Sequence, residues 1–146
     1  MRRFRRVKGS VASYPQRATE GSAGYDIRSY EQVVIRPMEC KYIATGLKVS
    51  MNKDEVFLVA PRSSLFKKYH CILPNSLGVI DSDFIDNKDN EGHFVIPLLN
   101  MSTTESVTIP YGERIAQGIF VNYLTTDDDV PVLKTRTGGF GSTDRQ

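Results

Sequence analysis

The sequence predicts an all-β domain of the sandwich or barrel type. Short runs rich in apolar and β-branched residues recur along the chain and are separated by turn residues, which is typical of many short strands. One stretch alone has the spacing of a helix. The length of 146 residues, with 40% hydrophobic and 25% charged residues, is that of one globular domain with a sizeable core.

The first three expected strands lie in the N-terminal half. Residues 33–35 (Val-Val-Ile) form a short run that ends before Pro37. Residues 41–49 are rich in β-forming residues, and Gly46 is expected to form a bulge within them. Residues 55–60 (Glu-Val-Phe-Leu-Val-Ala) form a nearly continuous apolar run of the kind that buried strands have.

Four more strands are expected in the C-terminal half. Residues 93–99 are largely apolar. Pro97 within them predicts an edge position or a bulge, because proline cannot donate a hydrogen bond to a neighbouring strand. The other three runs of β-forming residues are 106–109, 115–124 and 130–133.

A short helix is expected after residues 61–62 (Pro-Arg). Ser63 or Ser64 is a suitable N-cap, and lysines occupy the last turn. Leu65 and Tyr69 fall on one face. A helix that opens with Arg-Ser-Ser presents backbone N–H groups, hydroxyls and a guanidinium together, which makes a candidate anion site. An ordinary capped helix with a surface arginine would have the same sequence.

The charge pattern predicts neither a nucleic-acid partner nor a membrane partner. The formal net charge is only +2. The basic residues within 2–8 are interpreted as a solvated end, and the aspartates at 127–129 as a solvated loop. No apolar run is long enough to span a membrane, and residues 7–13 are too polar for the apolar centre of a signal peptide. The chain is therefore expected to stay in the cytoplasm.

Cysteine and histidine do not follow the pattern of a structural metal site. Cys40 and Cys71 are expected to be reduced thiols in the cytoplasm. His70 and His93 lie far apart, without the Cys-x-x-Cys or His-x-x-x-His spacing that zinc sites use. Both histidines are interpreted as structural.

Residues 74–84 (Pro-Asn-Ser-Leu-Gly-Val-Ile-Asp-Ser-Asp-Phe) contain the main candidate for chemistry. Asp81 directly follows two apolar residues, which predicts a carboxylate at the mouth of a strand with apolar walls. A carboxylate in that position can act as a general base. A hairpin turn in which Asp and Ser satisfy backbone groups would have the same composition, and the stretch alone leaves both interpretations open.

Residues 136–143 (Arg-Thr-Gly-Gly-Phe-Gly-Ser-Thr) are too rich in glycine for a strand. Such a tail is usually a frayed terminus. Alternatively, its backbone N–H groups and Arg136 could bind phosphate while Phe140 covers an apolar or aromatic surface. The tail lacks the Gly-x-x-x-x-Gly-Lys-Ser/Thr order of a P-loop, which excludes that mechanism.

Five segments in order resemble the motifs of one family, the homotrimeric deoxyuridine triphosphate nucleotidohydrolases (dUTPases). One motif alone would be a weak signal, but the five together extend over nearly the whole chain. The segments are 23–26 (Ala-Gly-Tyr-Asp), 61–65 (Pro-Arg-Ser-Ser-Leu), 78–84 (Gly-Val-Ile-Asp-Ser-Asp-Phe), 112–117 (Gly-Glu-Arg-Ile-Ala-Gln) and 136–143.

The resemblance implies a jelly-roll-like β-barrel over residues 1–134 and a flexible glycine-rich arm, residues 135–146, that closes over an active site. It implies a homotrimer with three active sites shared at subunit interfaces. It also implies hydrolysis of dUTP to dUMP and pyrophosphate, which keeps uracil out of DNA and supplies dUMP for thymidylate synthesis. Mg²⁺ would be bound through the substrate triphosphate.

The resemblance also implies roles for individual residues. Asp81 matches the carboxylate that activates water for attack on the α-phosphorus. Asp26 matches a carboxylate that orients the water shell of the metal or braces the site. Residues 72–80 match a hairpin that reads uracil mainly with main-chain groups, with Asn75 near the base and the water. Phe84 matches a ring under the deoxyribose, where it would exclude a 2′-hydroxyl.

Further matches are substrate contacts at the phosphates and over the uracil ring, where Phe140 would lie. Glu113 and Arg114 are interpreted as a surface ion pair. The substrate-binding residues that the resemblance implies are Arg62, Ser63, Ser64, Asn75, Gly78, Val79, Ile80, Phe84, Gln117, Arg136, Phe140, Gly141, Ser142 and Thr143.

The third motif departs from the family pattern after Asp83. The family usually continues Asp-x-Asp-Tyr-Arg-Gly, whereas residues 84–86 read Phe-Ile-Asp, so the ring is kept but the Tyr hydroxyl is lost. A polar insertion, residues 85–92, is similar to those of dUTPases from some Gram-positive bacteria and their phages. It would reshape the rim of the site or contact a protein partner. For a phage-encoded chain, the compartment would be the host cytoplasm.

Two rival functions match parts of the sequence. A deoxycytidine triphosphate deaminase of the same fold superfamily, or a bifunctional enzyme, also has Arg-Ser-Ser. Its chemistry uses a Glu in the base pocket, however, and residues 72–84 contain none. A regulatory, protein-binding dUTPase would use residues 85–92 for its partner. The complete glycine-rich tail favours hydrolysis of dUTP over deamination.

Overall fold

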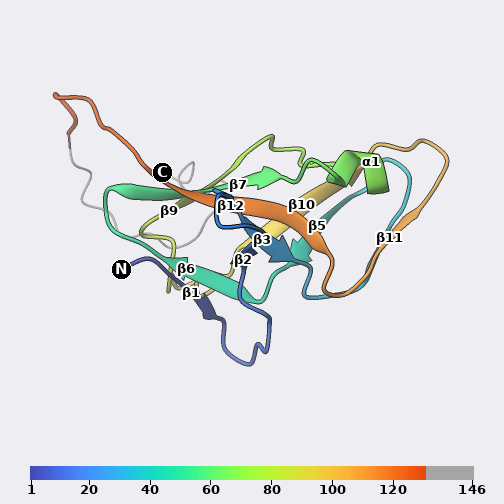
Figure 1. Ribbon diagram of the computed structural model, residues 1–146, viewed down its shortest axis with the longest axis horizontal. Helices are drawn as coiled ribbons and strands as arrows, with labels where there is room; N and C mark the ends of the chain where they lie inside the picture. Colours follow the sequence, from blue (N-terminus) through green and yellow to red (C-terminus); the bar gives the residue numbers. More distant parts are fainter. Residues whose placement is uncertain (131–146) are drawn as a thin grey trace.

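The computed structural model describes residues 1–130, which form short β-strands and one short helix (Figure 1). The helix, α1 (Leu65–Tyr69), is the one expected after the Pro-Arg pair. The all-β prediction is therefore confirmed for the described residues. No helix among them is long and apolar enough to cross a membrane.

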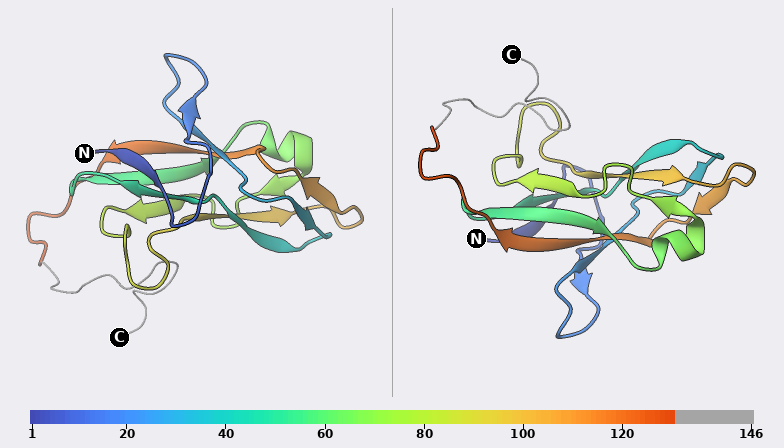
Figure 2. Two further views of the ribbon diagram at one scale, coloured as in Figure 1. Left: turned by 90° about the horizontal axis from the view of Figure 1, so that it is seen from below. Right: turned by 90° about the horizontal axis from the view of Figure 1, so that it is seen from above.

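The largest sheet has five strands in the order β2-β3-β12-β7-β9. All neighbouring strands in it are antiparallel, so β7 pairs with β12 on one side and with β9 on the other. Figure 2 shows that the segment around β2 stands out from the other strands. The strands are β2 (Gln16–Arg17), β3 (Tyr25–Arg28), β7 (Glu55–Pro61), β9 (Gly78–Asp81) and β12 (Arg114–Asn122).

Three smaller sheets contain the other strands. In one, β10 lies between β5 and β8, and the other two are the pairs β1-β6 and β11-β4. Their bounds are β1 (Arg3–Arg6), β4 (Val33–Ile35), β5 (Cys40–Ala44), β6 (Leu47–Ser50), β8 (Cys71–Ile72), β10 (Val95–Asn100) and β11 (Val107–Ile109). The pairings within residues 1–130 give four sheets and no closed ring of strands, so the jelly-roll-like barrel remains a prediction.

Two expectations about strands are corrected. Residues 41–49 form two strands instead of one bulged strand, because Gly46 has a φ of 71° and turns the chain between β5 and β6. In the expected strand 130–133, Val130 is not in a strand, and the other residues lie outside the described part of the chain.

Pro97 has a neighbouring strand on one side only, although β10 is the middle strand of its sheet. It lies in β10 opposite Tyr42 of β5. On the other side of β10, β8 pairs only with Leu99 and Asn100, which lie beyond the proline. The missing N–H of Pro97 therefore removes no bond from the β8 pairing.

The basic N-terminal run contains a strand that its composition does not predict. Arg3–Arg6 pairs residue by residue with β6, while its arginine side chains are exposed. Phe4, the one apolar residue of this strand, packs its ring edge-on against Phe57 and Tyr25, with centroids 5.5 and 5.4 Å apart. This aromatic contact attaches the N-terminal segment to the five-stranded sheet.

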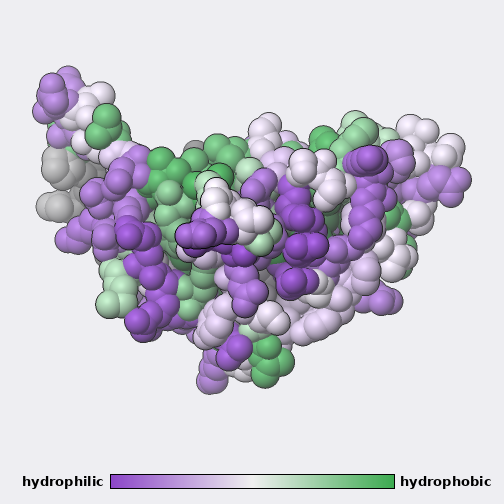
Figure 3. Space-filling view, in the orientation of Figure 1, coloured by the Kyte–Doolittle hydropathy of each residue, from purple (hydrophilic) through white to green (hydrophobic). Residues whose placement is uncertain are grey.

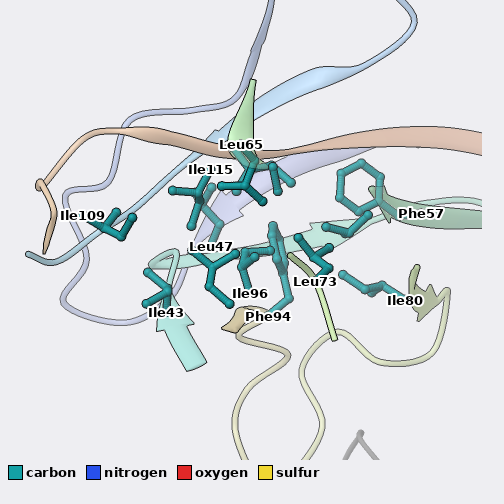
Figure 4. Packing of buried hydrophobic residues seen from close by; sticks show 14 of the residues in the cluster. Ile43, Leu47, Phe57, Leu65, Leu73, Ile80, Phe94, Ile96, Ile109 and Ile115 are labelled. Carbon is teal, nitrogen blue, oxygen red and sulfur yellow. The ribbon is translucent and has the colours of Figure 1, made fainter. Parts of the chain in front are cut away.

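The hydrophobic core is formed by the inward-facing residues of the sheets and by Leu65 of α1 (Figure 4). Burial alternates along β7, with Phe57 and Val59 buried between half-buried neighbours. Phe57 pairs across the strands with Ile80 of β9, which is also buried. Replacing a buried phenylalanine such as Phe57 with alanine is expected to cost about 3–5 kcal/mol.

Candidate active site

Three neighbouring strands bring together residues that are far apart in the sequence. Gln117 in β12 pairs with Asp26 of β3 on one side and with Ala60 of β7 on the other. Its Nε2 donates to the backbone oxygen of Pro61 at 3.1 Å. Arg62 follows Pro61 directly. The first, second and fourth sequence motifs therefore meet at one end of the five-stranded sheet.

Asp26 lies between two guanidinium groups. Nε of Arg62 donates to Oδ1 at 3.1 Å, and Nη1 of Arg114 lies 3.5 Å from Oδ2. The side chains of Arg62 and Asp26 are only 24% and 14% exposed, so water and salt screen this pair less than a surface pair. Removal of either partner would leave a poorly solvated charge without its counter-ion.

Arg62 also donates from Nη1 to Oγ of Ser64 at 3.3 Å. Ser64 is the N-cap residue of α1, but among the described residues its side chain makes no capping hydrogen bond. The two bonds of Arg62 use two of the five N–H donors of an arginine. We call Asp26, Arg62, Ser64, Arg114 and Gln117 the arginine–aspartate cluster. It presents guanidinium, hydroxyl and amide groups that can bind an anion such as phosphate.

Glu113 connects the fourth motif to α1. Its Oε2 accepts hydrogen bonds from Nζ of Lys68 at 2.9 Å and from the hydroxyl of Tyr69. Burial raises the pKa of Tyr69, and the bond to Glu113 raises it further. Burial alone would raise the pKa of Glu113, but Lys68 and Tyr69 hold it below its usual value. The predicted surface ion pair between Glu113 and Arg114 is wrong, because Glu113 pairs with Lys68 and Arg114 pairs with Asp26.

The segment expected to be a β-hairpin, residues 72–80, connects two different sheets. β8 pairs with β10, whereas β9 pairs with β7. The chain turns between them at Ser76, which has a φ of 64° and donates its N–H to the oxygen of Leu73 at 3.0 Å. The turn itself is confirmed, but its two arms are not partners of each other in the described structure.

Side chains alternate along β9. Ile80 points into the core, whereas Val79 is 61% exposed and Asp81 is exposed on the same face. A cavity behind the turn, lined in part by Asn75 and Gly78, has a volume of about 20 Å³. That is room for about one water molecule. A nucleobase would therefore have to contact the surface of this segment.

Phe84 lies mainly in the core. The residue is 5% exposed and belongs to the main hydrophobic cluster. Its backbone N–H donates to the oxygen of Asp81 at 3.1 Å and closes the turn after β9. In this arrangement only a small part of the ring can meet a ligand, and its expected contact with deoxyribose stays a prediction.

Asp81 and the arginine–aspartate cluster lie at opposite ends of β7. Asp81 pairs with Val56, whereas Ala116, next to Gln117, pairs with Pro61. The five residue-to-residue steps from Val56 to Pro61 advance about 17 Å along a strand. One chain therefore does not bring the candidate base together with the candidate phosphate-binding groups.

A hollow of about 700 Å³ lies on the β2 side of the cluster. Asp26 and Arg114 belong both to this hollow and to the arginine–aspartate cluster, and Arg17 and Arg28 add further positive charge. Within residues 1–130, no group of three or more His, Cys, Asp or Glu side chains could hold a metal ion.

The set of site residues predicted from the sequence leaves out two residues that contact its members, and five of its own members lie outside the described part of the chain. It omits Arg114, which contacts Asp26, and Gly24, which packs against the side chain of Gln117. The spacing of the motifs gave no signal for either contact, because both depend on the pairing of β3 with β12. Five of its members lie outside the described residues, namely Arg136, Phe140, Gly141, Ser142 and Thr143.

The chain is similar to known proteins over most of its length. The family model described as dUTPase matches residues 11–144. The deoxyuridine 5'-triphosphate nucleotidohydrolase of Lactococcus lactis subsp. lactis (strain IL1403) is 47% identical over 139 residues, which are 94% of this chain and 92% of the relative.

Two solved structures have the same fold. The dUTPase from Streptococcus mutans is 34% identical, with a TM-score of 0.79 over 85% of this chain and 98% of that one. The dUTPase of Staphylococcus bacteriophage 80alpha is 26% identical, with a TM-score of 0.73 over 93% and 98% of the two chains. A mutant of the phage enzyme has also been solved with dUpNHpp. On these similarities, the chain belongs to the dUTPase family.

Proposed function

We propose that this protein hydrolyses dUTP to dUMP and pyrophosphate, which keeps uracil out of DNA and supplies dUMP for thymidylate synthesis. The observation that carries the proposal is the arginine–aspartate cluster, where the second and fourth motifs contribute guanidinium, hydroxyl and amide donors and the first motif contributes the carboxylate that holds Arg62. Donors of this kind are what a triphosphate requires. The 47% identity to the Lactococcus lactis enzyme supports the same substrate.

Asp81 is the proposed general base. Its exposed carboxylate, at the end of β9, accepts a proton from a water molecule while the water oxygen attacks the α-phosphorus. The bond from the α-phosphorus to the bridging oxygen then breaks, and pyrophosphate leaves. Phosphoryl transfer depends mainly on an aligned nucleophile and on neutralised phosphate charge. One carboxylate and a cluster of donors provide these two requirements.

The phosphates are proposed to bind at the arginine–aspartate cluster. Arg62 and the hydroxyl groups of Ser63 and Ser64 contact phosphate oxygens, and the amide of Gln117 lies near the α-phosphate. Asp26 holds the guanidinium of Arg62 through its Nε, which leaves the other edge of the guanidinium for the anion. The tail residues from Arg136 to Thr143 are the proposed γ-phosphate contacts, with Phe140 over the base.

Mg²⁺ is proposed to bind with the triphosphate. Mg²⁺ keeps several waters and is usually held by one or two carboxylates together with substrate phosphates. The carboxylate of the cluster, Asp26, already has a guanidinium at each oxygen, so it fits a bracing role or a contact through water better than direct ligation. When bound, the ion would neutralise phosphate charge.

Uracil is proposed to be read by main-chain groups around residues 74–80. The amide of Asn75 can both donate and accept a hydrogen bond, so it can serve the base or the water. Gly78 lies opposite Val59 in the pairing of β9 with β7, where a Cβ on residue 78 would lie 3.2 Å from the Cβ of Val59. Phe84 is the proposed ring near the sugar, where a 2′-hydroxyl would be excluded.

The active site is proposed to be shared between copies in a homotrimer. A separation of about 17 Å along β7 is too long for one chain to align Asp81 with phosphates held at Arg62. A second copy can supply the missing half. An exposed apolar area supports such contacts, because Val79 and Val121 are exposed, and Figure 3 shows hydrophobic side chains gathered over β7, β9 and β12.

A nucleotide panel with pyrophosphate detection tests the function. The protein is incubated separately with dUTP, dCTP, dTTP and UTP, with and without Mg²⁺. Pyrophosphate and dUMP should form from dUTP alone, and only slowly without Mg²⁺. Release of ammonia from dCTP with dUTP left intact would instead identify a deaminase.

A further inference from the structure

Ion pairs connect residues near both ends of the insertion, residues 85–92, to the rest of the molecule. Nζ of Lys48 in β6 contacts Oδ1 of Asp86 at 2.6 Å and Oε1 of Glu91 at 2.9 Å. The Lys48 side chain is only 13% exposed, whereas the side chains of Asp86 and Glu91 are 64% and 38% exposed, so only the lysine end of this double ion pair is shielded from water. The bond to Asp86 raises the pKa of Lys48, and Lys48 lowers the pKa of Glu91. Glu91 also accepts from the backbone N–H of Lys8 at 3.2 Å.

Asn87 organises the inside of this loop. Its side-chain oxygen accepts from the backbone N–H groups of Asp89 and Asn90 at 3.0 and 3.1 Å. Its Nδ2 donates to the backbone oxygen of Phe84 at 2.7 Å and to Oδ1 of Asn90 at 2.7 Å. Asn87 is 7% exposed, so its amide depends on these partners.

A hydrogen-bonded path leads from this loop to the candidate base. Asn87 donates to the oxygen of Phe84, and the N–H of Phe84 donates to the oxygen of Asp81. The pairing of β9 with β7 ends at Asp81, so the turn that follows has no ladder to hold it. The loop is tightly closed as well, because a Cβ on Gly92 would lie 2.7 Å from Cα of Ile85.

We propose that residues 85–92 are a brace that sets the position of Asp81 and Phe84, with Asn87 and Lys48 as positioning residues. This inference rests on the proposed hydrolysis of dUTP. The bonds that the loop makes to the rest of the chain run to Lys8, to β6 and to the turn after β9. A shift of the base by a fraction of an ångström would misalign the attacking water, so the brace acts on turnover more than on binding.

The sharpest variant is Asn87→Asp. It keeps the oxygen that accepts from residues 89 and 90 but, when ionised, cannot donate to the oxygen of Phe84 or to Oδ1 of Asn90. Turnover should fall about tenfold or more, while the Kd for dUpNHpp stays within about threefold. Lys88→Ala is the matched control, because Lys88 is exposed on the same loop and has no side-chain partner within residues 1–130. Its turnover should match the wild type.

A second pair of variants covers the case in which Asn87→Asp does not fold. Lys48→Met removes both ion pairs and should lower turnover, whereas Lys48→Arg can still meet both carboxylates and should restore most of it. Wild-type turnover in a folded Asn87→Asp variant, or equal effects of Lys48→Met and Lys48→Arg, would overturn the brace.

Amide hydrogen exchange separates the brace from the proposed function. Asn87→Asp should speed exchange at the N–H of Phe84, whereas Lys88→Ala should leave it unchanged. This result does not depend on hydrolysis. If the wild type fails to hydrolyse dUTP, the proposed function is wrong. The exchange rate at the N–H of Phe84 still tests whether residues 85–92 hold the turn after β9. Unchanged exchange at Phe84 in Asn87→Asp contradicts the brace.

Discussion

Gln117 packs its side chain directly against the backbone of Gly24. A Cβ atom at residue 24 would lie 2.3 Å from Oε1 and 3.1 Å from Cδ of Gln117. No side chain fits at residue 24 unless Gln117 moves. The same amide donates to the oxygen of Pro61, so the bare backbone of Gly24 lets one residue bridge three motifs.

Gly24→Ala should therefore impair catalysis more than stability. The added methyl group displaces the amide of Gln117 and breaks its bond to Pro61, which is exposed and contributes little to folding. We expect kcat/KM for dUTP to fall about tenfold with little change in Tm. Gly21→Ala is the control, because a Cβ there meets nothing within 4 Å. Wild-type kinetics for Gly24→Ala would show that this position of Gln117 is not needed.

Asp26→Asn should lower turnover without changing the requirement for Mg²⁺. The substitution removes the negative charge between Arg62 and Arg114 and leaves two guanidiniums without their shared partner. Arg62 would then lose its fixed orientation toward the phosphates, and we expect a loss of about tenfold or more in kcat/KM. The measurement is a Mg²⁺ titration at saturating dUTP. A several-fold increase in the Mg²⁺ concentration for half-maximal rate would instead assign Asp26 to the water shell of the metal.

Asp81→Asn should remove most turnover and keep nucleotide affinity. An amide cannot accept a proton from water, and loss of a general base typically costs about 10²–10⁴-fold in rate. Single-turnover hydrolysis of dUTP gives the rate, and titration with dUpNHpp gives the affinity. Asp83→Asn is the comparison, since Asp83 follows the strand by two residues. An equal loss in both variants would leave the base unassigned.

Some of the predicted site residues lie together in the structure, but their distance from the candidate base was not predicted. Asp26, Arg62 and Gln117 are recognisable from their motifs, and the structure brings them within one cluster. Their distance from Asp81 was not predictable, because it depends on which end of β7 each neighbouring strand pairs with. The register of β9 and β12 on β7 is set by tertiary packing, which cannot be derived from a single sequence.

Long apolar runs were predicted correctly, and short or polar strands were missed. β7, with alternating burial along an apolar run, matched its expected range closely. β2 and β8 have two residues each, too few for any periodicity. β1 reads Arg-Phe-Arg-Arg, and its one apolar residue, Phe4, reveals its role only through the rings that it contacts.

His93 should make stability depend on pH in the weakly acidic range. Its Nε2 accepts the N–H of Gly46 at 2.9 Å, which requires the neutral ring. Burial lowers the pKa of His93 from its usual 6.5, against smaller opposite effects of Glu91 and Glu31. The unfolded chain therefore binds this proton more readily, so the stabilisation is present above the unfolded pKa and is lost as pH falls below it.

The measurement is the free energy of unfolding of the wild type and of His93→Gln, which does not titrate. The wild type should lose stability relative to the variant as pH falls from about 7 to about 5. The glutamates with lowered pKa values, such as Glu55 and Glu91, are present in both proteins, so the comparison with His93→Gln isolates the contribution of His93. Parallel curves for the two proteins would contradict the role of His93.

The proposed sharing of the active site predicts complementation between two inactive variants. Asp81→Asn lacks the base and Arg62→Ala lacks the phosphate contact, so each homotrimer is expected to be inactive. In a mixed trimer, a site that takes Asp81 from an Arg62→Ala chain and Arg62 from an Asp81→Asn chain has both groups. Random assembly of equal amounts produces this combination in about a quarter of the sites.

Co-expressed variants should therefore recover about a quarter of the wild-type rate of pyrophosphate release. If both groups came from the same chain, every site would lack one of them, and no activity would return. Co-expression of Asp81→Asn with Asp81→Ala is the control, since it restores no site under either arrangement. Light scattering establishes that the mixtures are trimers. A trimer without recovered activity would mean that Asp81 and Arg62 act within one chain, in spite of the length of β7 between them.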